Sequence, residues 1–167
     1  MRDLKRANAK LPAYRMLADL GFEVFTPMKW KLSEKQGRRE RKAVPVMQDL
    51  LFVHDSKCRL GPVVDRTPTL QFRFVRNGFC EPMTVRDAEM ERFIQAVGNL
   101  DGVRYFRPDE ISPEMFGCEV RIVGGPFDGY EGRLLSIRGS KKKRLIVELP
   151  DLLTAGIEIN PEYIQML

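Results

Sequence analysis

Apolar positions recur along the chain at two different periods, and each period predicts a different kind of secondary structure. Helical spacing over residues 11–20 predicts a first helix, with Asn8 as its cap, Pro12 in its first turn and Gly21 as its end. The same spacing over residues 84–97 predicts a second helix. Its apolar stripe, which we expect to face a core, consists of Met90, Phe93, Ile94 and Val97.

Alternating or continuous apolar runs predict three strands in the first part of the chain. They lie at residues 22–25, 50–53 and 70–75. The segment between the second and third of these contains Gly61-Pro62, and we expect it to be mostly loop with at most a short helix. Strands and helices in mixed order predict an α+β unit with an antiparallel sheet.

The C-terminal part differs, because short strands alternate there with turns rich in Gly, Pro and Lys. The expected strands are residues 119–123, 132–137, 144–149 and 156–159. Such a segment makes a small closed or nearly closed β-barrel, since closure removes exposed strand edges. The predicted division is an α+β domain over residues 1–103, a turn-rich linker over 104–116 and the all-β barrel over 117–167.

The positive charge of the chain is concentrated in one segment. The whole chain has 28 Lys and Arg against 23 Asp and Glu, a net charge of +5. Residues 29–42 alone contain seven basic and two acidic residues, which is also +5. Apolar residues are scarce after Leu32, so we expect an exposed, mobile hairpin loop. It is either a solvated linker or a basic arm directed at phosphates or an acidic protein surface.

Composition argues against several classes of function. No apolar run is long enough to span a membrane and no secretory signal is present, so we expect a cytoplasmic protein without membrane contact. Cys58, Cys80 and Cys118 form no Cys-x-x-Cys pair and are expected to be reduced core residues. Because His54 is the sole histidine and no nucleotide-binding or hydrolase motif occurs, we expect no enzyme activity, cofactor or metal.

Residues 120–137 (VRIVGGPFDGYEGRLLSI) resemble a KOW motif, in which two strands are joined by a Gly-rich loop. Gly129 and Gly132 would provide positive φ or close backbone approach where the chain reverses. The loop presents Phe127, Asp128 and Tyr130, which are our candidates for contact with a partner.

Residues 21–27 (GFEVFTP), the basic segment and residues 49–53 (DLLFV), in that order, resemble the N-terminal domain of the NusG family of transcription elongation factors. The resemblance continues through residues 81–85 (EPMTV) into the second helix, and with the KOW motif it covers nearly the entire chain. Within that family the chain is most similar to antiterminators of the UpxY type, which act on long capsular polysaccharide operons.

The resemblance implies a regulator that suppresses pausing by binding RNA polymerase, with an apolar patch of the N-terminal domain against it. Leu50 and Phe52 share one face of their strand by period-two alternation, and Leu51 and Val53 face the opposite side. We expect Leu50 and Phe52 to form this patch together with Tyr14 from the first helix. A small exposed apolar patch is the usual sign of a partner site, although core packing remains an alternative for both strand residues.

The resemblance also places the basic segment near DNA in the elongation complex. The residues expected to neutralise phosphates there are Arg38, Arg39, Arg41 and Lys42. Trp30 either stacks on an exposed base or packs against the strand end. The KOW domain would bind a second protein, a ribosomal component or a termination factor. The basic turn over residues 141–144 keeps RNA contact open as well.

Three features depart from the family pattern. The chain has no aromatic strand before the first helix, and we expect codons for one in frame upstream of Met1. Gln48-Asp49-Leu50 replaces the family's Pro-Gly-Tyr, and Gly61-Pro62 interrupts a segment that is helical in many relatives. The alternatives are a ribosome-associated KOW protein that binds rRNA and, third, a nucleic-acid enzyme with the basic arm as a clamp. The sequence leaves the oligomeric state open.

Overall fold

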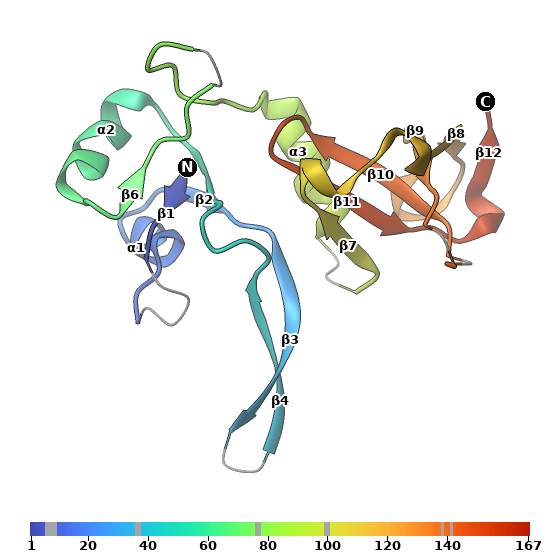
Figure 1. The fold of residues 1–167 in the computed structure, drawn as a ribbon, viewed down its shortest axis with the longest axis horizontal. Coiled ribbons are helices and arrows are strands. Elements are labelled where there is room, and N and C mark those ends of the chain that lie inside the picture. Colours follow the sequence, from blue (N-terminus) through green and yellow to red (C-terminus); the bar gives the residue numbers. More distant parts are fainter. Residues whose placement is uncertain (6–9, 36–37, 76–77, 99–100, 138, 141) are drawn as a thin grey trace. The chain divides into compact units, whose positions relative to one another are not determined.

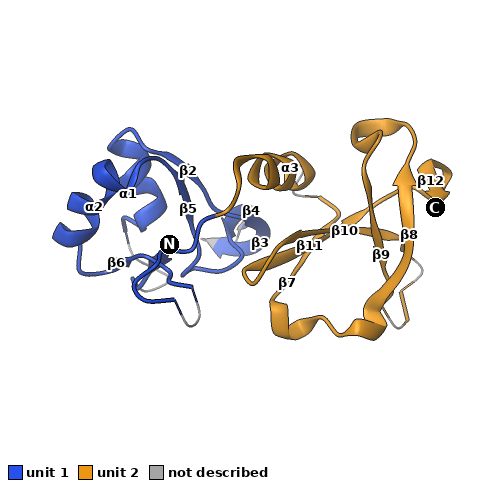
Figure 2. Ribbon diagram, turned by 90° about the horizontal axis from the view of Figure 1, so that it is seen from above, with its two compact units in different colours: residues 1–84 blue, residues 85–167 orange. Residues whose placement is uncertain are grey.

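The computed structural model describes residues 1–5, 10–35, 38–75, 78–98, 101–137, 139–140 and 142–167, apart from the side chains of residues 35 and 38. The chain divides into two compact units, Met1–Thr84 and Val85–Leu167, which Figure 2 distinguishes by colour. Each unit has its own secondary structure (Figure 1). The cap expected at Asn8 lies outside the described residues.

Unit 1 packs two helices against short antiparallel ladders. The helices are α1 (Ala13–Asp19) and α2 (Lys57–Arg66). The ladders pair β1 (Arg2–Asp3) with β6 (Leu70–Gln71), and β2 (Glu23–Phe25) with β5 (Phe52–His54). The shared core consists of Ala13, Leu17, Phe22, Leu51, Leu60 and Leu70. The strands predicted at residues 22–25 and 50–53 and the first helix are thereby confirmed, each with shorter bounds.

A two-residue strand without an aromatic residue, β1, precedes the first helix; the strand expected to be absent from the chain was an aromatic one. The amide nitrogen of Leu51 donates to the carbonyl oxygen of Met1 at 3.3 Å, and the terminal nitrogen of Met1 donates to the carbonyl oxygen of Leu51 at 2.7 Å. Because β1 pairs with β6 on its other side, residues 1–3 lie between β6 and the start of β5. Short as it is, this segment occupies the centre of the small sheet.

The basic segment forms two regular strands instead of the expected loop. β3 (Met28–Lys35) and β4 (Arg38–Pro45) pair antiparallel without a register shift, from Met28 opposite Pro45 to Lys35 opposite Arg38. In Figure 1 the pair extends as a ribbon beyond the helices of unit 1. The expectation of a loop was wrong because backbone pairing between two strands does not require apolar side chains on either face.

The segment around Gly61-Pro62 was expected to be mostly loop with at most a short helix. Helix α2 instead runs through Gly61 and Pro62 without a break. Pro62 lacks only the amide that would bond to the carbonyl oxygen of residue 58 near the start of the helix. The Ser56 side chain caps the helix by accepting from the Arg59 amide, and Leu60 is buried in the core. Capping and burial therefore offset the weak propensity of the Gly-Pro pair.

Unit 2 is built on one antiparallel sheet of six strands with the order β12-β8-β9-β10-β11-β7. Its strands are β7 (Val103–Phe106), β8 (Phe116–Ile122), β9 (Glu131–Leu135), β10 (Arg144–Leu149), β11 (Leu153–Glu158) and β12 (Ile164–Met166). Short 3-10 helices cover Pro108–Glu110, Pro113–Met115, Gly125–Phe127 and Pro161–Tyr163. The four strands expected in the C-terminal part are present, and β7 and β12 are additional.

Helix α3 (Asp87–Val97) packs against β10 and β11 and belongs to unit 2. It buries Phe93, Ala96 and Val97, whereas Ile94 of the expected stripe is exposed. The division of the structure therefore falls before this helix and not at residue 103. The expected linker over residues 104–116 contains most of β7, which is held by its pairing with β11.

Two smaller expectations also differ from the structure. The strand expected over residues 70–75 is limited to β6, and beyond it Phe74 forms an isolated bridge with Pro82. Cys58, Cys80 and Cys118 are free thiols but exposed, so they are not core residues. Cys58 is exposed on α2, and Cys118 is exposed in β8 at the point where the register shifts between Phe116 and Glu119.

Candidate functional site

The outer face of the β2–β5 ladder carries an aromatic pair. Phe25 and Phe52 are directly opposite in the register, and their ring centroids lie 6.2 Å apart in a tilted arrangement. Leu51 and Val53 contribute to the core of unit 1, so alternation directs Phe52 to the other face. Both rings are only partly buried. Phe52 was expected in this patch from the sequence and Phe25 was not, although the alternation of residues 22–25 was a signal for Phe25.

The other two residues of the expected patch do not join this pair. Leu50 has only 1% of its surface exposed, and the Thr26 hydroxyl donates to its carbonyl oxygen at 2.9 Å. Leu50 lies in the turn before β5 and not in the strand itself, so the alternation of strand residues could not predict that its side chain is buried. Tyr14 packs, partly buried, against the core that contains Leu51. The exposed part of the patch is therefore the pair Phe25–Phe52.

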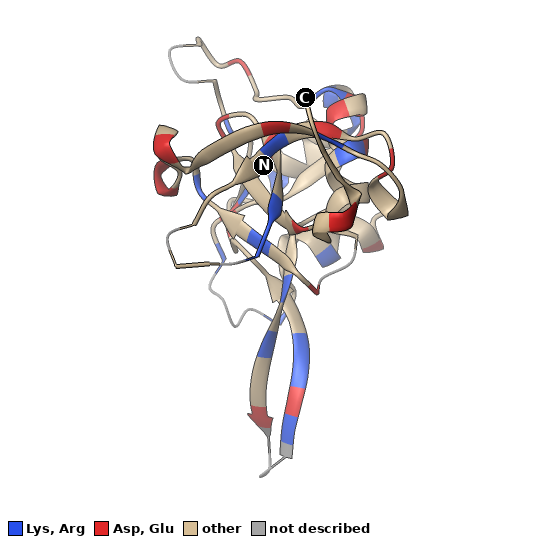
Figure 3. Cartoon of the chain, turned by 90° about the vertical axis from the view of Figure 1, so that its right-hand side faces the viewer, with Lys and Arg blue, Asp and Glu red and all other residues tan. Residues whose placement is uncertain are grey.

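The register of β3 and β4 sorts the hairpin side chains onto two faces. We call one the aromatic face; it holds Met28, Trp30, Leu32, Glu34, Arg39, Arg41, Ala43 and Pro45. We call the other the lysine face; its described side chains are Lys29, Lys31, Ser33, Glu40, Lys42 and Val44. Figure 3 shows basic segments along both strands of the hairpin. The sequence predicted the charge but not this division.

The lysine face brings like charges together. Lys31 and Lys42 are directly opposite, an arrangement that destabilises a β-ladder unless an anion neutralises it. On the aromatic face, Arg39 is opposite Glu34 and the Arg41 guanidinium lies 5.1 Å from the Trp30 ring centroid. The side chain of Arg38 lies outside the described part. Of the four basic residues expected to neutralise phosphates, Arg39, Arg41 and Lys42 are exposed.

The loop between β8 and β9 holds the three residues expected to contact a partner. The Asp128 carboxylate accepts from the Gly124 amide at 2.6 Å, so Asp128 braces the loop. Phe127 and Tyr130 form an edge-to-face pair with ring centroids 6.2 Å apart. Gly124, Gly125 and Gly129 all have positive φ, which a side chain would strain.

Tyr130 also makes a contact that the sequence did not indicate. Its hydroxyl donates to the carbonyl oxygen of Arg92 in α3 at 3.0 Å. Burial raises the pKa of Tyr130 above its usual value near 10, and the positive charge of Arg92 opposes that shift in part. Because this bond already engages Tyr130, Phe127 is the better candidate of the two aromatic residues for contact with a partner.

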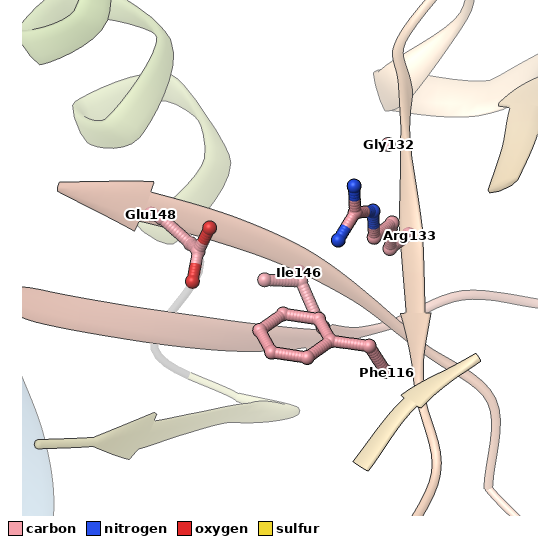
Figure 4. Close-up of a pocket in the computed structure, with 5 residues that line it drawn as sticks. All are labelled: Phe116, Gly132, Arg133, Ile146 and Glu148. Carbon is pink, nitrogen blue, oxygen red and sulfur yellow. The ribbon is translucent and has the colours of Figure 1, made fainter. Parts of the chain in front are cut away.

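A shallow pocket on the sheet of unit 2 was not foreseen from the sequence. It has a volume of about 300 Å³ and is lined by Phe116, Gly132, Arg133, Ile146 and Glu148 (Figure 4). In the close-up, Arg133 and Glu148 lie on opposite sides of Ile146. The Arg133 guanidinium carbon lies 5.6 Å from the Phe116 ring centroid, and its Nε lies 3.4 Å from Oε1 of Glu119. The pocket is therefore amphipathic, with both signs of charge at its rim.

Within the described part of the chain, no three His, Cys, Asp or Glu side chains gather where they could hold a metal ion. The Nδ1 atom of His54 lies 2.9 Å from the Glu23 carboxylate, and both side chains are largely exposed. None of the described helices combines the length and the apolar character that a membrane crossing requires.

The fold and surfaces define a two-unit protein: an α+β unit with an exposed aromatic pair and a basic hairpin, followed by a β-rich unit. The family model described as transcription termination factor nusG matches residues 3–94, more than half of the chain. The chain belongs to the NusG family, a family of transcription factors that generally interact with RNA polymerase. The match covers nearly all of unit 1 and ends inside α3. No curated protein matches the chain significantly.

Proposed function

We propose that this protein regulates transcription elongation as an antiterminator and that unit 1 binds RNA polymerase through the pair Phe25–Phe52. The observation that carries the proposal is this pair, which lies partly exposed on a ladder inside the matched region. Two aromatic rings side by side offer apolar area that a protein partner can bury, and such anchors dominate binding energy. The partner would be the polymerase with which the family interacts.

The basic hairpin would contact nucleic acid in the same complex. Arg39, Arg41 and Lys42 are exposed, and a polyanion would relieve the repulsion between Lys31 and Lys42. Contacts of this kind add affinity and salt dependence but little sequence information. We therefore expect the hairpin to strengthen binding to the elongation complex, where DNA is present, more than binding to the polymerase alone.

Unit 2 would act as a KOW domain that recruits a second protein, a ribosomal component or a termination factor. Phe127 on the β8–β9 loop supports this assignment, because it is an aromatic residue at the tip of a loop braced by Asp128. In the turn after β9, the Lys142 ammonium is paired with the Glu158 carboxylate at 2.8 Å, which reduces the charge that this turn offers to RNA. Lys141 lies outside the described residues.

The narrower resemblance to UpxY-type antiterminators suggests the target. It implies long capsular polysaccharide operons, read by the polymerase in the cytoplasm. A shift in the ratio of promoter-distal to promoter-proximal transcripts upon deletion of the gene, confined to such operons, would support this part of the proposal. An equal effect on all operons would contradict it.

Affinity purification with polymerase from the native host tests the central claim. The protein should retain RNA polymerase after nuclease treatment, and Phe52→Ala or Phe25→Ala should weaken retention about tenfold, the usual cost of losing an aromatic anchor. Phe79→Ala is the matched control, because Phe79 also lies in unit 1 and is 97% exposed. Circular dichroism establishes that each variant is folded.

The same preparation separates the proposed function from the ribosomal alternative. Polymerase retention that is unaffected by nuclease and lost in both aromatic variants supports the proposal. Co-sedimentation with a ribosomal subunit that RNase abolishes, together with no polymerase retention, would refute it. Equal weakening by Phe79→Ala would also refute the assignment to the Phe25–Phe52 pair.

A further inference from the structure

The sheet of unit 2 carries apolar side chains on both of its faces. Ile146 of β10 is buried in an apolar cluster on one face, whereas its neighbour Leu145 alternates to the other face and is buried there. The segment between β7 and β8 contributes Ile111 and Met115 to the cluster and so covers the first face. Phe116 follows directly and lines the pocket of Figure 4, so the pocket lies where this cover ends.

The charges at the rim of this pocket are not equally compensated. Arg133 is paired with Glu119, and 3.4 Å separate the Nε atom of the arginine from the Oε1 atom of the glutamate. Among the residues that the structure describes, Glu148 makes no ion pair, and its Oε1 atom accepts from the neutral Thr154 hydroxyl at 3.5 Å. One negative charge is therefore left uncompensated beside an apolar floor.

The floor and this carboxylate together suit one kind of side chain. Phe116 and Ile146 provide apolar surface, and Figure 4 shows Glu148 to one side of Ile146. Lysine and arginine combine a run of methylenes with a charged head, and they bury the stem on apolar surface while the head reaches a polar partner. The volume of about 300 Å³ is at the lower end for ligand sites, which fits a single long side chain better than a large cofactor.

We propose that this pocket anchors a lysine or arginine side chain from an exposed segment of a protein partner. Its methylene stem lies on Phe116 and Ile146, and its charged head pairs with Glu148. The inference rests on the proposed function, in which unit 2 recruits a second protein, and it specifies the chemistry of one contact with that protein. The residues that line the pocket do not include Phe127, so this contact is separate from the one proposed for the β8–β9 loop.

An acidic or nucleic-acid ligand fits the pocket less well. Arg133 is the one cation among the described residues that line it, and this guanidinium is already engaged by Glu119 and by the Phe116 ring. A phosphate or carboxylate would approach the negative charge of Glu148 without an unengaged cation to offset the repulsion. A basic side chain instead neutralises that charge, so charge complementarity favours a basic segment.

Peptide titrations of the full chain, followed by amide chemical shifts in the absence of polymerase, test the proposal. The first probe is a capped pentapeptide with one lysine between alanines and glycines, and the second has arginine in its place. Either should shift the amide signals of β9 and β10. The same peptide with norleucine has a similar stem without the charge and should bind more weakly, and a glutamate peptide should produce no shifts.

Variants assign the binding to the carboxylate. Glu148→Gln should weaken binding of the basic peptides about two- to fivefold, the range of an exposed ion pair, and leave the norleucine peptide unaffected. Glu148→Lys should reverse the preference and favour the glutamate peptide. Glu162→Gln is the matched control, because Glu162 is an exposed glutamate of unit 2 that does not line the pocket. Phe127→Ala should leave peptide binding unchanged.

Each outcome bears on the inference. Shifts in β9 and β10 that need a basic side chain and weaken in Glu148→Gln support it. Equal binding of all peptides overturns it, as do shifts confined to the β8–β9 loop and binding that Glu148→Gln and Glu162→Gln weaken equally. Shifts that follow the concentration of the chain itself, without a response to peptide, would assign the pocket to a second copy and also overturn it.

The proposed function is tested separately, through polymerase retention by Phe25 and Phe52 in unit 1. Retained polymerase together with no response to the basic peptides would refute this inference alone. A pocket that binds the basic peptides in a chain that retains no polymerase would refute the proposed function alone.

Discussion

The hydroxyl of Tyr130 donates a hydrogen bond to the carbonyl oxygen of Arg92, with 3.0 Å between the two oxygens. This bond ties the β8–β9 loop to α3 within unit 2. Residue 92 also lies in the part of the chain that the NusG family model matches. The loop proposed to recruit a second protein is therefore already engaged by a helix that precedes the sheet in the chain.

Removing this hydroxyl should loosen α3. Tyr130→Phe keeps the edge-to-face contact with Phe127 but loses the bond to Arg92, which we expect to cost about 1 kcal/mol or less because the bond is exposed. Hydrogen exchange of the α3 amides should become a few times faster, while exchange in β3 and β4 stays unchanged.

The matched control is Tyr163→Phe, a substitution of the same kind in the same unit. The Tyr163 ring packs against Gly124 and Gly125. Exchange in α3 that is accelerated equally by both substitutions would contradict a specific role for Tyr130.

Because of Tyr105, the stability of unit 2 should depend on pH. Burial raises the pKa of Tyr105 to about 12, and its hydroxyl has no hydrogen-bond partner among the residues that the structure describes. The folded state thus keeps the proton above pH 10, where the unfolded chain loses it. The stability that this group contributes is complete below pH 10 and is lost as the pH rises towards 12, by roughly 2 kcal/mol at most.

The substitution Tyr105→Phe isolates that effect. It removes a buried hydroxyl without a partner, so unit 2 should be equally stable or slightly more stable at pH 7. Urea unfolding followed by circular dichroism should show a smaller loss of stability between pH 8 and pH 11 than in the wild type. An unchanged pH dependence would exclude Tyr105 as its source.

Much of the fold followed from apolar periodicity, which is a local signal. The strand over residues 22–25, the helix α3 and the strands of the C-terminal part were all visible as patterns of period two or three to four. The hairpin was mistaken for a loop, because strands that are exposed on both faces have no apolar alternation to detect. Helix α2 was underestimated, as at most a short helix, because Gly61-Pro62 has poor helix propensity, and tertiary burial of Leu60 overrides that propensity.

The candidate sites were predictable to the extent that they depend on residue type. Charge identified the hairpin and the Gly-rich motif identified the β8–β9 loop. The burial of Leu50 was not predictable, because it depends on the turn before β5 and on the bond from Thr26. The contact between Tyr130 and Arg92 joins residues 38 positions apart, so no local pattern contains it.

Two glycines should respond to alanine in opposite ways. Neither Gly61 nor Gly129 has an atom within 4 Å of the position of an added Cβ, so only backbone conformation matters. Gly61 lies inside α2 without positive φ, and Gly61→Ala should stabilise that helix by about 0.5–1 kcal/mol. Gly129 has a φ of 78°, and Gly129→Ala should destabilise its loop by about 1 kcal/mol.

Hydrogen exchange of the amides of α2 and of the β8–β9 loop measures the two effects separately. Slower exchange in α2 and faster exchange in the loop are expected in the respective variants. Loss of stability in Gly61→Ala would mean that the helix is not continuous through its Gly-Pro pair.

At the pair Lys31–Lys42, a substitution that stabilises the hairpin should weaken its binding to nucleic acid. Lys42→Glu replaces a like-charge pair by an opposite-charge pair directly across the ladder and should stabilise the hairpin by a few tenths to about 1 kcal/mol. The same change removes a cation and adds an anion, so affinity for nucleic acid should fall. The slope of log affinity against log salt should become shallower by about one to two. Amide exchange in β3 and β4 and oligonucleotide titrations at two salt concentrations measure these effects.

Lys42→Gln should be intermediate in both hairpin stability and nucleic-acid affinity, because it removes repulsion without adding attraction. A variant that is more stable and binds as tightly as the wild type would show that the lysine face does not contact phosphates, and the repulsion would then need another explanation.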